Sequence, residues 1–300
     1  MRWFNKCIVW ILPVFPKPFI WIFSRRYIAG RTIEDGIQKA KRLNDEGCMV
    51  TMDVLGEYIT DLCEAETAKQ SCMDILEAIK REKINGNLSL KLSQLGLNID
   101  REVCYRNVKA IVQKAAETGS FVRIDMEDSA ATDATLDIYR RLRKEFKNVG
   151  VVIQAYLKRS KDDVRKLIAE EIAHLRICKG IYQEPASIAF KDKQAIRDNY
   201  LDLVRTMFES GSYVGLATHD RILIDGILAM VENLKVPPNQ FEFQMLLGVT
   251  EHLRTQLVSN GHTLRVYVPY GEQWYGYCMR RMKENPQVAG HIVKNLFIRG

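Results

Sequence analysis

The stretch VVIQAYLKRSKDDVRKLIAEEIAHLRICKGI, residues 151–181, contains one complete strand–helix–strand unit. Its ends, 151–157 and 175–181, are short apolar runs of strand length, and the segment between them has the periodicity of a helix. Ser160 is expected to cap that helix. The apolar face of the helix comprises Val164, Leu167, Ile168 and Ile172. A helix that connects two strands in this way predicts that the strands lie parallel in one sheet.

Similar strand-like runs recur from about residue 47 onward, separated by helical segments. They lie at 49–55, 88–93, 121–126, 151–157, 175–181, 213–218, 241–247 and 264–270. Eight such repeats predict an α/β fold, a closed (β/α)8 TIM-type barrel, rather than an open doubly wound sheet. No G-x-G-x-x-G motif or P-loop follows any of the runs, which weakens the open nucleotide-binding sheets further. We therefore predict an apolar, helical N-terminal arm over 1–46 and a barrel catalytic domain over 47–300.

The composition is that of an ordinary globular protein. The chain has 300 residues, 47% of them hydrophobic, with 44 Lys and Arg against 37 Asp and Glu, which gives a net charge of +7. This surplus is small and forms no basic block, so nucleic-acid binding is not expected. The seven cysteines are scattered without a C-x-x-C pair, and the five histidines form no metal-binding motif. We expect no disulfide framework, no metal site and a reducing compartment.

The N-terminal segment CIVWILPVFPKPFIWIF, residues 7–23, is almost entirely apolar. Three prolines and Lys17 interrupt it, so a single transmembrane helix is not expected. Two interpretations remain open. The segment can form an arm that packs on the main domain, or it can lie on an anionic membrane surface. The second interpretation uses the basic residues that flank the segment, which are Arg2, Lys6, Arg25 and Arg26.

Polar or ionisable side chains lie at or just after the ends of most predicted strands. They are Lys91, Asp125 with Glu127, Gln154, Arg176 with Lys179, His219, Gln244 and Tyr267. Each one alone can be a surface charge or a salt-bridged structural residue. The carboxyl ends of barrel strands meet at one rim, however, and active sites of such barrels lie there. Together these residues predict a site, whose cations suit a phosphate-bearing cofactor and an anionic substrate.

The segment PYGEQWYGYCMRRMKEN near the C-terminus adds a second group of charges. Arg280 and Arg281 are adjacent, and Glu284 follows within one helical turn. One interpretation is a solvated helix face with an ordinary ion pair. The other is a carboxylate clamp, in which two guanidinium groups bind an acid and Glu284 holds one of them in position.

Six separated motifs resemble the monofunctional proline dehydrogenases. In chain order they are FVRIDMED, VVIQAYLKRS, RICKGIYQEP, ATHD, FEFQMLLG and RVYVPYGEQWYGYCMRRMKE, and the similarity runs from about Arg25 to Lys294. The resemblance implies a (β/α)8 barrel that binds FAD non-covalently. It also implies oxidation of L-proline to 1-pyrroline-5-carboxylate, the first step of proline catabolism to glutamate. A hydride would pass from proline C5 to flavin N5, and a membrane quinone would then receive the electrons.

The resemblance also implies roles for particular residues. Arg176 would lie beside the flavin N5–O4 edge, and Gln154 would bond the isoalloxazine ring. The complete set of implied FAD contacts is Gln154, Arg176, Lys179, Gly180, Tyr182, Thr218, His219 and Gln244. The implied substrate-site residues are Lys91, Asp125, Tyr267, Arg280, Arg281 and Glu284.

Within the implied substrate site, Arg280 and Arg281 would hold the proline carboxylate with the help of Lys91. Tyr267 would pack on the pyrrolidine ring, and Asp125 would fix Lys91 or Tyr267 in position.

Three residues depart from the usual family pattern, which are Ile181, Asp220 and Gly276. Asp220 stands where Asn is frequent and puts negative charge near the expected pyrophosphate, so it could weaken flavin binding. The chain ends at Gly300, too short for a fused aldehyde dehydrogenase, and a separate pyrroline-5-carboxylate dehydrogenase is therefore expected downstream. The resemblance and the N-terminal arm together suggest a cytoplasmic protein attached peripherally to the inner face of the membrane.

Two other function classes remain as alternatives. The first is a flavin-free barrel lyase or aldolase that uses Lys91 or Lys179 as a Schiff base. The second is a non-catalytic, membrane-attached binding protein on a degenerate barrel. That alternative requires a broken clamp, yet the clamp residues Arg280, Arg281 and Glu284 are all present.

Overall fold

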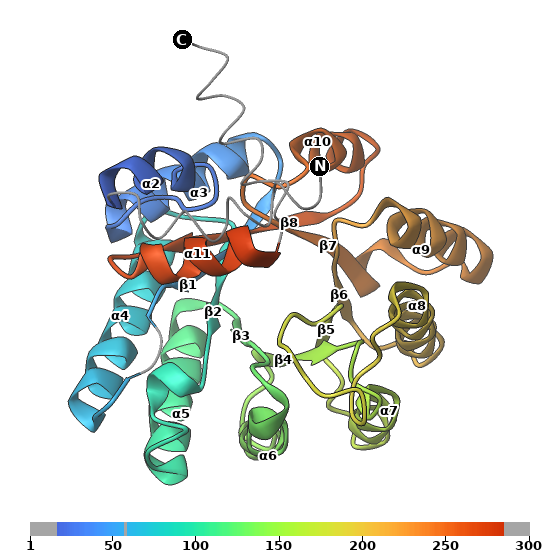
Figure 1. Ribbon diagram of the computed structural model, residues 1–300, viewed down its shortest axis with the longest axis horizontal. Coiled ribbons are helices and arrows are strands. Elements are labelled where there is room, and N and C mark those ends of the chain that lie inside the picture. Colours follow the sequence, from blue (N-terminus) through green and yellow to red (C-terminus); the bar gives the residue numbers. More distant parts are fainter. Residues whose placement is uncertain (1–16, 57–58, 285–300) are drawn as a thin grey trace.

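The computed structural model describes residues 17–56 and 59–284. Eight parallel strands close into a barrel in the order in which they occur in the chain (Figure 1). They are β1 (Met49–Val54), β2 (Gly86–Leu90), β3 (Val122–Ile124), β4 (Val149–Gln154), β5 (Leu175–Cys178), β6 (Val214–Ala217), β7 (Phe241–Leu246) and β8 (Leu264–Tyr270). β8 pairs in parallel with β1, which closes the sheet. The predicted (β/α)8 TIM-type barrel is confirmed.

Helices precede, separate and follow the strands along the chain, and most of them surround the barrel in Figure 1. They are α2 (Lys17–Ser24), α3 (Ile33–Asp45), α4 (Leu62–Arg81), α5 (Arg101–Thr118), α6 (Thr132–Arg143), α7 (Ser160–Ala169), α8 (Lys193–Glu209), α9 (Arg221–Leu234), α10 (Glu251–Ser259) and α11 (Trp274–Glu284). Short 3-10 turns occur at η2 (Ser93–Leu95), η3 (Ser129–Ala131) and η4 (Pro238–Gln240).

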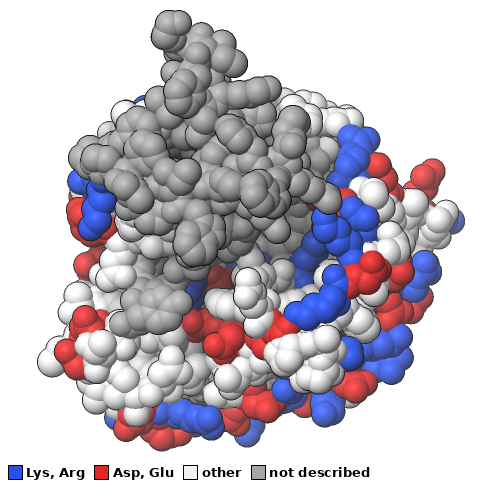
Figure 2. All heavy atoms as spheres, viewed as in Figure 1, with Lys and Arg blue, Asp and Glu red and all other residues white. Residues whose placement is uncertain are grey.

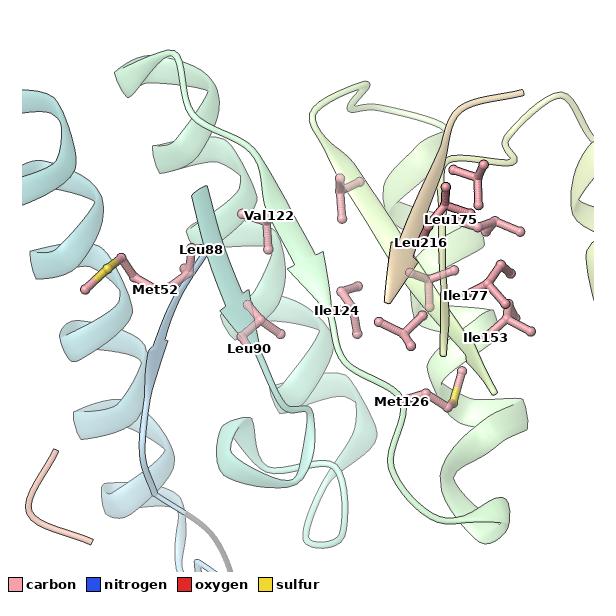
Figure 3. Close-up of a cluster of buried hydrophobic side chains, with 14 of the residues drawn as sticks. Met52, Leu88, Leu90, Val122, Ile124, Met126, Ile153, Leu175, Ile177 and Leu216 are labelled. Atoms are coloured by element: carbon pink, nitrogen blue, oxygen red, sulfur yellow. The ribbon is translucent and has the colours of Figure 1, made fainter. Parts of the chain in front are cut away.

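Alternate residues of each strand point to opposite faces of the barrel wall. The apolar set, which includes Met52, Leu88, Ile124 and Ile177, packs in the core between strands and helices (Figure 3). Polar residues such as Asp53 and Arg176 occupy the other set and are also buried. The fold is therefore stabilised by an apolar layer outside the strands, while the barrel interior carries charges.

The described segment before β1 packs against the barrel and against α11. Thr32 and Asp35 form a capping box that starts α3, and the apolar face of α3 joins the main core against β1 and β8. α2 packs on α11, where the Trp21 and Trp274 ring centroids are 4.7 Å apart. The part of the apolar N-terminal segment before Lys17 lies outside the described residues. Within the described ranges, no helix is long and apolar enough to cross a membrane.

The charged surface carries many ion pairs. Arg141 pairs with Glu102 at 2.6 Å, and Lys109 pairs with Glu145 at 2.7 Å. On the face shown in Figure 2, basic and acidic side chains lie interspersed.

The predicted cap at Ser160 is wrong. Ser160 is the first residue of α7, its hydroxyl donates to the main-chain oxygen of Gln154, and Arg159 precedes the helix without a side-chain cap. α7 also ends earlier than expected, at Ala169, and Glu171 beyond it has a φ of +56°. Ile172 therefore packs against the core from outside the helix.

Gly150 on β4 tests the packing inside the barrel. A Cβ there would lie 2.3 Å from Arg123 Nη1 and 2.5 Å from the carbonyl oxygen of His174. We expect Gly150→Ala to lower the free energy of unfolding by roughly 1–3 kcal/mol, because the wall has no room for the methyl group. Chemical denaturation of the purified protein measures this loss.

Gly226→Ala on α9 is the matched control. Its Cβ would approach the end of the Leu201 side chain at 3.3 Å, and alanine favours a helix over glycine. We expect the control to keep or raise the denaturation midpoint. Equal losses in both variants would show that the Gly150 contact is not limiting.

Candidate active site

A cavity of about 640 Å³ lies at the carboxyl ends of the strands. The predicted site residues that line it are Lys91, Asp125, Gln154, Arg176, Lys179, Gly180, Tyr182, Thr218, His219, Gln244 and Tyr267. Arg280, Arg281 and Glu284 belong to α11, but their side chains lie outside the described part of the structure. The structure thus gathers eleven predicted residues around one cavity, and the clamp stays a prediction.

Asp125, directly after β3, is the centre of the hydrogen-bond network on the inner wall of the cavity. Its Oδ1 accepts from Arg176 Nη1 and from Ser89 Oγ, both at 2.7 Å. Its Oδ2 accepts from the Tyr267 hydroxyl at 2.8 Å and lies 3.8 Å from Lys91 Nζ. Burial alone would raise the pKa of Asp125, but the charges of Arg176 and Lys91 outweigh it and hold this pKa below its ordinary value. Asp125 is therefore an anion that orients three neighbours.

Asp53 is a site residue that the sequence analysis missed. It lies in β1 with no exposed surface, and Lys91 Nζ donates to both of its oxygens at 3.1 Å. Burial raises the pKa of Asp53, and the nearby Lys91 opposes that rise. A lone aspartate inside the apolar run MVTMDVL was the available signal. Lys91 consequently lies between two carboxylates, with the Tyr267 hydroxyl 3.4 Å away.

Arg176 is held from its other side by a chain of polar contacts. Its Nε donates to Gln244 Oε1, and Gln244 Nε2 donates to Glu242 Oε1 at 2.6 Å. Glu242 in turn forms an ion pair with Arg265 at 2.6 Å. Burial would raise the pKa of Glu242, but the Arg265 charge outweighs it and lowers this pKa. Gln244 is fixed in the orientation that presents its oxygen to Arg176.

Gln154 lines the cavity and carries a buried acceptor. Its Nε2 donates to the main-chain oxygens of Met126 and Glu127 at 3.1 Å each, which fixes the orientation of the amide. Its Oε1 is buried and has no hydrogen-bond partner among the described residues. A buried acceptor without a donor costs about 1–3 kcal/mol, so this oxygen suits an N–H group of a ligand.

The loops after β5 and β6 form the outer part of the cavity. Gly180 has a φ of +99°, and a Cβ there would lie 2.0 Å from the Tyr156 ring, so this position requires glycine. His219 Nε2 accepts from the backbone N–H of Leu246 at 2.9 Å, which places the proton of a neutral ring on Nδ1. Across the described residues, no group of three His, Cys, Asp or Glu side chains is placed to hold a metal ion.

The comparisons with known proteins agree with this geometry. The family model described as proline dehydrogenase matches residues 36–294. The chain belongs to the proline dehydrogenase family. The similarity that the six motifs indicate is thereby confirmed, and the family is one of oxidoreductases.

Relatives in the proline dehydrogenase family match over most of their length. The chain is 39% identical to proline dehydrogenase 1 of Bacillus subtilis (strain 168), over 91% of this chain and 90% of that protein. It is 37% identical to proline dehydrogenase 2 of the same strain, over 92% and 90%. It is 36% identical to the proline dehydrogenase of Deinococcus radiodurans, over 92% and 91%.

Solved structures support the fold of this family member. Proline utilization A (PutA) from Bdellovibrio bacteriovorus, inactivated by N-propargylglycine, superposes with a TM-score of 0.82 at 22% identity. The match covers 88% of this chain and 32% of that one. The chain therefore spans about a third of that structure, and the likeness concerns the barrel.

Asp53→Ala tests the buried ion pair of this proline dehydrogenase family member. Removing the carboxylate takes away the two hydrogen bonds that the Lys91 ammonium donates to Asp53 at 3.1 Å. We expect a loss of about 3 kcal/mol in the free energy of unfolding, because the ion pair with the fully buried Asp53 is broken. Asp225→Ala removes the exposed partner of Arg221 and should change stability by less than about 0.5 kcal/mol. Equal effects of the two variants would contradict the assignment.

Proposed function

We propose that this chain oxidises L-proline to 1-pyrroline-5-carboxylate with FAD bound in the cavity. The observation that carries the proposal is the pairing of the oriented Gln154 Oε1 with the fixed Arg176 guanidinium on one cavity wall. A flavin ring has an N–H that needs an acceptor, and it becomes anionic on reduction. The cation would stabilise that charge and so tune the reduction potential. A volume of about 640 Å³ also falls in the usual range of ligand pockets.

The remaining cavity residues fit an FAD site. Lys179, Gly180 and the His219 loop would hold the ribityl–diphosphate part, since they lie together in the outer part of the cavity. The other proposed contacts are Tyr182, Thr218 and Gln244. When bound, FAD supplies the acceptor for the hydride that leaves proline C5. Gln244 would act mainly through Arg176, whose Nε it fixes.

The substrate would bind beside the Asp125 network. Arg280, Arg281 and Lys91 would bind the proline carboxylate, and Glu284 would hold one arginine in position. Burial raises the pKa of Tyr267 well above 10, so its neutral hydroxyl donates to Asp125 while its ring packs on the pyrrolidine. Proline must lose its ammonium proton before hydride transfer, and the cationic clamp would lower the pKa of the bound amine.

The proposal extends to an electron acceptor, to a downstream enzyme and to the N-terminal arm. A membrane quinone would take the electrons from the reduced flavin, and a separate dehydrogenase would oxidise the product. Residues 1–46 would form an arm before the catalytic domain over 47–300. That arm would contact the inner face of the membrane from the cytoplasm. The support for this contact is that segment 7–23 is apolar and flanked by basic residues.

The Schiff-base lyase alternative fits the cavity less well. A Schiff-base lysine needs a neutral amine. Lys91 Nζ donates to Asp53, and Lys179 Nζ donates to Asp220, so a carboxylate binds each of these amines. The ion pairs at both lysines therefore favour the flavin proposal.

Reduction by proline is the direct test of the proposed function. We expect the purified protein to be yellow, and anaerobic L-proline to bleach its visible absorbance, because hydride transfer reduces the flavin. L-Alanine at the same concentration, which has no ring C5, should leave the spectrum unchanged. Bound flavin that L-proline does not bleach would overturn the assignment.

Arg280→Met and Arg281→Met test the carboxylate clamp. Each variant should raise the apparent KM for L-proline more than tenfold, because a charge-assisted hydrogen bond contributes about 1.5–3 kcal/mol. Lys283→Met, which removes the same charge from the same helix, should change KM little. An unchanged KM in both arginine variants would show that the carboxylate is bound elsewhere.

A further inference from the structure

Asp220 sits between two cations at the outer end of the cavity. Its Oδ2 accepts from Lys179 Nζ, which also lines the cavity, and from Arg197 Nε of α8 at 2.8 Å. Its Oδ1 accepts from the backbone N–H of Ile222 at 3.1 Å and so caps α9. The two oxygens have separate tasks, since one caps the helix and the other binds both cations.

The cations that line the cavity differ in their burial and in the carboxylates that bind them. Lys91 and Arg176 are buried at the inner wall and bind Asp53 and Asp125 there. The Lys179 side chain is 39% exposed at the outer end, so it can turn toward a ligand with less loss of packing. The phosphates of a dinucleotide need such cations. Lys179 lines the outer part of the cavity, and Arg197 binds the same Asp220 oxygen from α8.

Asp220 competes with a phosphate for the same two cations. Burial would raise the pKa of Asp220, but hydrogen bonds from Arg197 and Lys179 outweigh it and lower the pKa to about 2, so the group is a carboxylate at neutral pH. Together Lys179, Arg197 and Asp220 carry a net charge of +1 rather than +2. A diphosphate that approaches Lys179 therefore meets a smaller positive charge and a neighbouring anion.

We propose that Asp220 is an internal anion that weakens the hold of this chain on the FAD diphosphate by occupying Lys179 and Arg197. The proposal rests on the proposed function, since it takes FAD as the cofactor, and it adds the residue that limits FAD affinity. Asp220 would thus set how readily the cofactor leaves the protein, without contact with the reacting atoms.

Asp220→Asn isolates the charge from the helix cap. Asparagine caps a helix as well as aspartate does, so α9 keeps its start while the two cations lose their anion. FAD release on dilution of the full-length holoenzyme, followed by the recovery of flavin fluorescence, gives the dissociation constant. We expect Asp220→Asn to bind FAD about five- to tenfold more tightly at low salt. The gain should shrink as salt is raised, because ions screen the freed charges.

Two further variants make the result decisive. Asp220→Ser also removes the charge and keeps a capping side chain, so it should tighten FAD binding in the same direction. Asp225→Asn removes an equal charge from α9 at the exposed Arg221 pair and should leave FAD affinity unchanged. Unchanged or weaker binding in both Asp220 variants would overturn the proposal, and so would equal tightening in Asp225→Asn.

Failure of this inference is distinguishable from failure of the proposed function. If the wild-type protein binds FAD and L-proline bleaches it while both Asp220 variants keep the wild-type affinity, the inference alone is wrong. If the wild-type protein binds no FAD, both are wrong.

Discussion

The Asp125 carboxylate, held inside a closed barrel, is the interaction on which the site depends. Its hydrogen-bond partners Ser89, Arg176 and Tyr267 come from β2, β5 and β8, while Asp125 itself follows β3. Strands β5 and β8 are not neighbours of β3 in the sheet, so their side chains reach Asp125 only through the barrel interior. Closure of the barrel therefore creates the inner wall of the cavity. Loss of the Asp125 carboxylate would remove a hydrogen-bond partner from Arg176 and from Tyr267 at the same time.

This arrangement buries several charged side chains in the barrel interior. Asp53, Arg176 and Glu242 are almost completely buried, and burial of a charge is unfavourable unless partners compensate for it. The partners are present as a continuous series from Arg265 through Glu242 and Gln244 to Arg176. The apolar outer faces of the strands supply the stability that the interior does not (Figure 3). Gln154 Oε1 differs from these groups, because its buried acceptor has no partner among the described residues.

The sequence predicts the strands better than the contacts between them. Buried parallel strands appear as apolar runs, so all eight were identifiable, and polar residues after those runs marked the rim. Asp53 and Glu242 lie within their strands, and only the closed barrel shows that their side chains face the same interior. Ser160 has the composition of a helix cap but bonds Gln154 instead, because the preceding turn brings that oxygen within reach. The double pairing of Asp220 likewise depends on how α8 and α9 pack.

We expect a flavin ring to bind against the cavity wall that Gln154 and Arg176 form. An experimental structure of the flavin-bound protein tests it most directly. In that structure we expect a flavin N–H to donate to Gln154 Oε1, with the Arg176 guanidinium beside the ring and still bonded to Asp125 or Gln244. A flavin bound elsewhere, or one in the cavity with Gln154 Oε1 still unpartnered, would contradict it.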